Sequence, residues 1–289
     1  MIGLKKESGP LETKKYSSAF QSILLLLFSY ATAFIMESAL HELGHAIVGL
    51  IKGYTIESFV VHPFLMSHVI LDPPTASIEG GIAGVALSLS VSSLIGILFW
   101  KRRSISNLPL QMIFPTALIM SGIEFTINMI EPTSDINGVM QFTGLPAILF
   151  YVIGIVLLSL GIFFYNSLFP LLGLAPEDRK SLLVVPAGIS LYNLLGVIFA
   201  YLFEPTSRAR ALHHPDPTGF AILRAHNYLI IGVIFGVIVA VVYITLYRRF
   251  YRRLPPSLQT EKVNLTWRDL LIPGLLFTIL VVFLLLIYN

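Results

Sequence analysis

Long apolar runs dominate this chain, and they restrict it to a fold in which most of the backbone is helical. Inside a bilayer every backbone N–H and C=O group must be bonded within the protein, so apolar runs of about 20 residues are expected to span as helices. Hydrophobic residues make up 55% of the 289 residues and charged residues only 12%. A soluble domain carries about twice that charged share. We therefore expect an all-α polytopic membrane protein in contact with a lipid bilayer.

The apolar runs predict about seven transmembrane helices. They cover residues 20–51, 81–100, 108–130, 145–172, 182–203, 227–247 and 270–288. Between the first two runs, residues 53–78 are too polar and too rich in proline to span. The alternating pattern from Thr55 to His62 instead predicts a short β-hairpin or re-entrant segment after the first helix.

The distribution of Lys and Arg predicts the orientation in the membrane. With seven spans and the N-terminus inside, all but four of the 19 basic residues lie on the inner side; the exceptions are Lys52, Arg208, Arg210 and Arg224. The positive-inside rule then makes the N-terminus cytoplasmic. The net charge of +3 reflects these basic loops and gives no reason to expect a nucleic-acid partner.

The first apolar run contains the pentapeptide His41-Glu42-Leu43-Gly44-His45, an H-E-x-x-H motif. Residues four apart share a face of a helix, so His41 and His45 can present two imidazole nitrogens to one metal ion. Zn²⁺ is the usual occupant of such a pair, and Glu42 is then the general base that takes a proton from the attacking water. Ionisable residues inside a membrane are expensive, which favours a functional interpretation.

A catalytic zinc site takes three protein ligands, and the chain has no cysteine to supply one. Asp135 is the first candidate, because it follows the third predicted span and precedes Asn137-Gly138, which permits a turn that aims the carboxylate inward. Glu124, inside the third span, is the rival as a ligand or as a hydrogen-bond acceptor for an imidazole. Glu37, one helical turn before His41, is a second candidate for such a supporting role.

The motif and the residues after it resemble the site-2 protease family of intramembrane zinc metalloproteases. The resemblance covers residues 20–150 and implies one Zn²⁺ per chain, with His41, His45 and Asp135 as ligands and Glu42 as the base. It also implies that Asn128 contacts the substrate backbone or the reaction oxyanion. Gly80-Gly81-Ile82-Ala83-Gly84 is similar to a glycine-rich segment of the family, although the Pro and Asn of that segment are missing.

On this interpretation the chain has three parts: a cytoplasmic tail at residues 1–19, a catalytic membrane core at residues 20–172, and C-terminal transmembrane helices of unassigned role at residues 173–289. The expected partner is a membrane protein substrate, with any regulatory partner unknown. The alternative is a transporter or channel that uses the His and acidic residues to conduct a metal ion or proton. The sequence shows no internal repeat of the kind found in many transporters.

Overall fold

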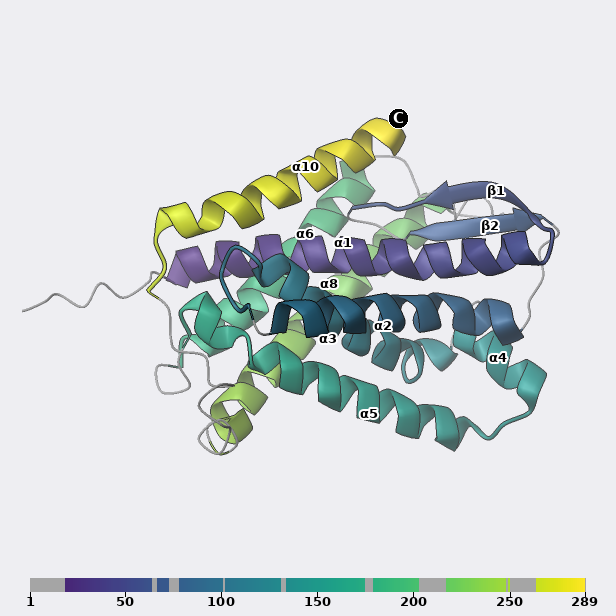
Figure 1. Ribbon diagram of the computed structural model, residues 1–289, viewed down its shortest axis with the longest axis horizontal. Helices are drawn as coiled ribbons and strands as arrows, with labels where there is room; N and C mark the ends of the chain where they lie inside the picture. The colour runs from purple at the N-terminus through teal and green to yellow at the C-terminus, as the bar shows by residue number, and fades with distance from the viewer. Residues whose placement is uncertain are drawn as a thin grey trace, which may run out of the picture.

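The computed structural model describes residues 19–63, 67–72, 78–100, 102–130, 134–174, 179–202, 217–247, 249 and 264–288 (Figure 1). All but the last residue of the expected cytoplasmic tail lies outside these ranges. In chain order the elements are α1 (Ala19–Ile51), β1 (Thr55–Val60), β2 (His68–Asp72), α2 (Ile78–Trp100), α3 (Leu108–Glu124), η1 (Asn128–Ile130), α4 (Asp135–Thr143), α5 (Ala147–Asn166), η2 (Phe169–Leu172), α6 (Ser181–Leu202), α8 (Pro217–Val242), η3 (Tyr243–Tyr247), η5 (Trp267–Leu270) and α10 (Leu271–Tyr288).

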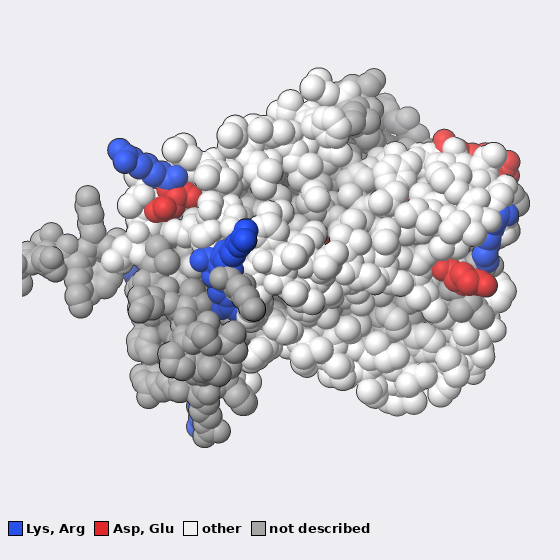
Figure 2. All heavy atoms as spheres, in the orientation of Figure 1, with Lys and Arg blue, Asp and Glu red and all other residues white. Residues whose placement is uncertain are grey.

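Six helices in the described part of the chain are long and apolar enough to cross a membrane. The spans are Ala19–Ile51, Glu79–Trp100, Ala147–Asn166, Ser181–Ile198, Leu229–Leu246 and Trp267–Leu286. Charged groups gather toward the two ends of the molecule, and a broad, largely uncharged band lies between them (Figure 2). The prediction of a multi-pass, mainly helical membrane protein is therefore confirmed.

The third predicted span, residues 108–130, differs from the expectation. Helix α3 has 17 residues and ends at Glu124, so it is about 26 Å long, less than the roughly 30 Å of a bilayer core. A turn and the short helices η1 and α4 follow, and α4 lies at the end of the molecule where α1 finishes (Figure 1). The count of seven spans thus stays a prediction.

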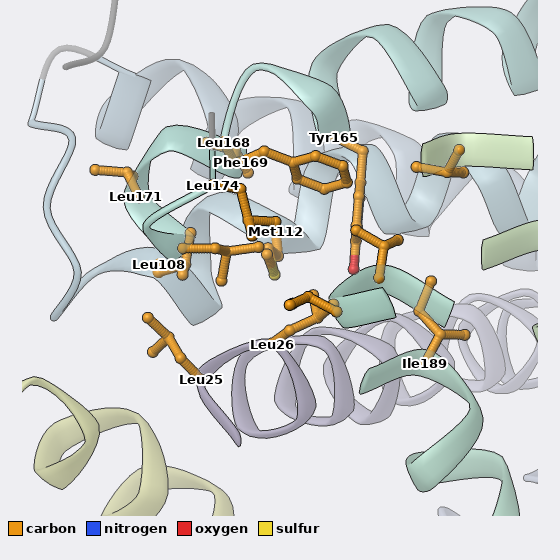
Figure 3. Close-up of a cluster of buried hydrophobic side chains, with 14 of the residues drawn as sticks. Leu25, Leu26, Leu108, Met112, Tyr165, Leu168, Phe169, Leu171, Leu174 and Ile189 are labelled. Atoms are coloured by element: carbon orange, nitrogen blue, oxygen red, sulfur yellow. The ribbon is translucent and has the colours of Figure 1, made fainter. Parts of the chain in front are cut away.

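A hydrophobic cluster holds the first half of α1 against the surrounding helices. Leu25 and Leu26 of α1 are completely buried, together with Leu108 and Met112 of α3 (Figure 3). The cluster is completed by Tyr165 at the end of α5, the η2 segment, and residues of α6 and α8. Because the first half of α1 packs against this cluster, the position of α1 is fixed relative to the other helices, and so is the position of the motif in its second half.

The segment after α1 forms the expected β-hairpin. Strands β1 and β2 pair antiparallel, from Thr55 opposite Asp72 to Val60 opposite His68. The hairpin folds back along the second half of α1 (Figure 1), where a Cβ atom on Gly49 would lie 2.7 Å from the Leu71 side chain.

Pro63, which follows β1, is hydrogen-bonded to the middle of α6. The Tyr192 hydroxyl donates to the Pro63 carbonyl over 2.6 Å, and Tyr192 lies well inside the candidate span Ser181–Ile198. The end of β1 therefore lies beside the middle of α6. His62, next to the turn, is buried, and this burial lowers the pKa of its imidazole to about 4, so the ring is neutral at pH 7.

We expect Tyr192→Phe to loosen the hairpin, because the buried Pro63 carbonyl then loses its partner at a cost of about 1–3 kcal/mol. Hydrogen–deuterium exchange of residues 55–72 should become faster. Tyr243→Phe is the matched control, since it removes a similar bond to the Leu174 carbonyl elsewhere in the protein. Equal exchange of the hairpin in the two variants would contradict the anchoring role of Tyr192.

Candidate metal centre

Helix α1 brings two imidazole rings together. His41 and His45 lie one turn apart, their ring centroids are 4.8 Å apart, and their Nε2 atoms are separated by 3.0 Å. The His45 Nδ1 atom lies 2.8 Å from the Gly80 carbonyl of α2. Because a carbonyl can only accept, Nδ1 carries a proton, and Nε2 is the ring atom that faces His41 and Asp135.

A carboxylate from a distant part of the chain completes the group. Asp135 Oδ2 lies 3.3 Å from His41 Nε2 and 3.1 Å from His45 Nε2. These three atoms form a triangle with sides of 3.0, 3.1 and 3.3 Å. Ligand atoms at zinc–ligand distances of about 2.0–2.1 Å in a tetrahedron are about 3.3 Å apart, so the triangle fits one face of such a site. His41, His45 and Asp135 can therefore hold a metal ion.

The start of α4 places Asp135. Ser134 caps this helix, and its hydroxyl accepts a hydrogen bond from the Asn137 backbone N–H over 3.1 Å. The Asn137 side chain donates to the Met129 carbonyl over 2.8 Å and so ties α4 to η1. The expected turn at Asn137 and Gly138 is wrong, because both residues lie inside α4. The carboxylate is aimed by a capped helix N-terminus, where negative charge is favoured.

The electrostatic surroundings keep Asp135 ionised. Burial alone would raise the pKa of its carboxyl group, but hydrogen bonds from His41 and His45 outweigh this effect and hold the pKa below its usual range. The Asp135 side chain is 38% exposed, whereas the His41 and His45 side chains are only 15% and 11% exposed. The triad is therefore open on the Asp135 side and closed on the side of α2.

Glycines of α1 and α2 make room for the triad. A Cβ atom on Gly84 would lie 2.6 Å from His45 Nε2 and 2.7 Å from His41 Nε2. One on Gly81 would lie 2.7 Å from the Asp135 carbonyl oxygen, and one on Gly44 would overlap the Ala83 carbonyl. Side chains at these positions would separate α1, α2 and α4, so the glycines allow the close approach that assembles the site.

The three glutamates predicted to take part in the site differ in their relation to the triad. Glu42 and Glu37 both lie within electrostatic reach of His41; Glu42 is half-buried, while Glu37 is only 3% exposed. Glu124 is not among the converging ligand atoms of the described residues. Its Oε1 atom instead accepts a hydrogen bond from Asn128 Nδ2 over 2.6 Å. Asp135, and not Glu124, thus lies with the two histidines.

The supporting roles of Gly80, Gly81 and Gly84 were missed by reasoning from the sequence. Taken alone, the sequence of this segment indicates only a similarity to a family motif. The available signal was the spacing of Gly80 and Gly84, four residues apart on an apolar helix, because small residues at this spacing let two membrane helices approach closely.

Searches against protein-family models, curated proteins and solved structures found no match to this chain. The site-2 protease resemblance therefore depends on the motif residues themselves.

We expect Gly84→Ala to reduce metal affinity at least 10-fold, because the added methyl group would displace both imidazole rings. Gly138→Ala is the matched control: this helical glycine has nothing within 4 Å of the position of an added Cβ atom. Isothermal titration with Zn²⁺ would measure both variants. Unchanged affinity in Gly84→Ala would show that the packing of α2 does not define the site.

Proposed function

We propose that this protein is an intramembrane zinc metalloprotease that hydrolyses peptide bonds in or near the transmembrane segments of other proteins. The observation that carries the proposal is that Asp135 of α4 lies within ligand distance of His41 and His45. The two histidines belong to α1, a helix long and apolar enough to span a membrane. Two imidazoles and one carboxylate are a usual ligand set of zinc hydrolases, which leave a fourth position open.

A zinc ion held by this triad would supply Lewis acidity, polarising the substrate carbonyl and lowering the pKa of water. Glu42 follows His41 directly in the chain and lies within electrostatic reach of it. In the proposed mechanism its carboxylate accepts a proton from the attacking water and passes it to the leaving amine. Protonation of the amine lets the C–N bond break, which yields a carboxylate and a free amino group.

Asn128 is proposed to bind the substrate backbone or its oxyanion. The hydrogen bond to Glu124 uses one N–H of the Asn128 amide, and the amide has a second N–H that can donate to a substrate oxygen. Glu124 then orients Asn128 and does not ligate the metal. Glu37 is proposed to support His41 from the buried side.

The β1–β2 hairpin is proposed to position the substrate. A helical peptide bond is shielded by its own hydrogen bonds, so a transmembrane substrate must be extended before it can be cleaved. A two-stranded sheet has outer edges that can pair with an extended segment, and this sheet lies along the half of α1 that carries the motif (Figure 1). The N-terminus is proposed to be cytoplasmic, as the positive-inside rule predicts.

We expect the purified protein to contain about one zinc per chain, the stoichiometry of a three-residue catalytic site. His41→Ala and Asp135→Ala should each lose most of the bound metal, because each removes one of three ligands. Inductively coupled plasma mass spectrometry would measure the content. Glu124→Gln is the matched acidic control and should retain zinc. Loss of zinc in Glu124→Gln, with retention in Asp135→Ala, would show that Glu124 and not Asp135 is the third ligand.

We expect Glu42→Gln to keep its zinc and to lower proteolysis at least 100-fold, the range by which positioned general bases accelerate reactions. The assay would use liposomes that contain the protein and a single-span reporter labelled at both ends, with products analysed by mass spectrometry. Undiminished cleavage in Glu42→Gln would exclude the proposed base. Zinc uptake into the liposomes without any cleavage would instead indicate a transporter.

A further inference from the structure

Helices α1 and α2 face each other through two rows of residues spaced four apart, a spacing that keeps side chains on one face. The rows are His45, His41 and Glu37 on α1, and Gly80, Gly84, Ser88 and Ser92 on α2. His45 contacts the Gly80 carbonyl, and the Ser88 hydroxyl lies beside the Glu37 carboxyl group. The two rows therefore run antiparallel from the metal centre into the interior of the protein.

Helix α3 forms the third wall of this interior region, since it packs against both α1 and α2. A Cβ atom on Gly96 of α2 would lie 3.0 Å from Phe114 of α3. Counting along the two antiparallel helices from this contact brings Ser121 of α3 level with Ser88. By this count, the polar groups of the three helices lie at similar levels, one to two helical turns from the triad.

These polar groups are fully enclosed and incompletely satisfied by protein atoms. Ser92 is 0% exposed and Ser121 is 2% exposed, and neither hydroxyl group has a hydrogen-bond partner among the described residues. Glu37, at 3% exposed, brings a carboxyl group with two oxygen atoms into the same region. Buried polar groups in proteins are almost always hydrogen-bonded, and internal water is the usual partner when the protein supplies none.

We propose that the interface of α1, α2 and α3 below the metal centre binds internal water, held by Glu37, Ser88, Ser92 and Ser121. A water molecule donates two hydrogen bonds and accepts two, so it can bridge a carboxylate and several hydroxyl groups at once. An internal water normally has two to four such partners, and this region offers that number. The site lies on the closed side of the triad, away from the exposed Asp135.

This water site does not depend on the proposed protease function, because it follows from buried hydroxyl groups alone. If the protein is a hydrolase, the site stores water beside a centre where each turnover consumes one molecule. It also keeps Glu37 hydrated one turn from His41, in a part of the protein that bulk solvent does not reach.

The test compares the thermal stability of Ser92→Ala, Ser121→Ala and the double variant in lipid nanodiscs. A hydroxyl group that binds water stabilises the fold, so each single variant should lower Tm by about 2–4 °C. The double variant should lower Tm by less than the sum of the two shifts, because the two residues share the same water. Ser159→Ala is the matched control: its hydroxyl is exposed on α5 and bonds only the Ile155 carbonyl, at 2.7 Å.

A high-resolution structure of the unmodified protein in nanodiscs should show ordered water within about 3 Å of the Ser92 and Ser121 hydroxyl oxygens. A dry interface predicts the opposite result, since removing an unsatisfied buried hydroxyl group is neutral or stabilising. Tm values equal to or above that of Ser159→Ala, or no water density at these oxygens, would overturn the proposal. Neither result would change the outcome of the zinc and Glu42 experiments.

Discussion

The candidate site depends on the close contact between α1 and α2. At Gly44 the backbone of α1 meets the Ala83 carbonyl, and at Gly84 the backbone of α2 lies under both imidazole rings. Helices in lipid gain no hydrophobic stabilisation from association, so they hold together through close packing and hydrogen bonds between them. The contact supplies both, because the same approach brings the Gly80 carbonyl to His45. The site is thus a product of helix packing in the membrane.

The β1–β2 hairpin shows how non-helical backbone is accommodated beside helices that are long enough to span a membrane. Lipid offers no hydrogen-bond partners, so non-helical backbone is tolerated there only where protein or enclosed water satisfies it. The strands β1 and β2 satisfy each other, and Tyr192 supplies a partner for the turn at Pro63. The hairpin can therefore lie along the half of α1 that carries the motif with the backbone groups between its two strands paired inside the protein.

The long helices could be predicted from the sequence because their cause is local. An apolar run of sufficient length must be helical in lipid, and α1 begins and ends within one residue of its predicted limits. The pairing of His41 with His45 follows equally from helical spacing. The end of α3 could not be predicted in this way, because apolar residues continue past Glu124 to Ile130. The chain leaves the helix there to reach η1 and α4, and contacts made by Asn137 and Ser134 become apparent only in three dimensions.

The placement of Asp135 on a separate short helix has a consequence for the stability of the fold. His41 and His45 both belong to α1, whereas Asp135 lies 94 residues after His41 on α4, a helix that is capped by Ser134. An ion shared by the two would link remote parts of the folded chain, and because the site does not exist in the unfolded polypeptide, the free energy of metal binding would add to the stability of the fold. In a protein that has no cysteine and so no disulfide, a bound metal ion would thus stabilise the fold in addition to any part it takes in catalysis.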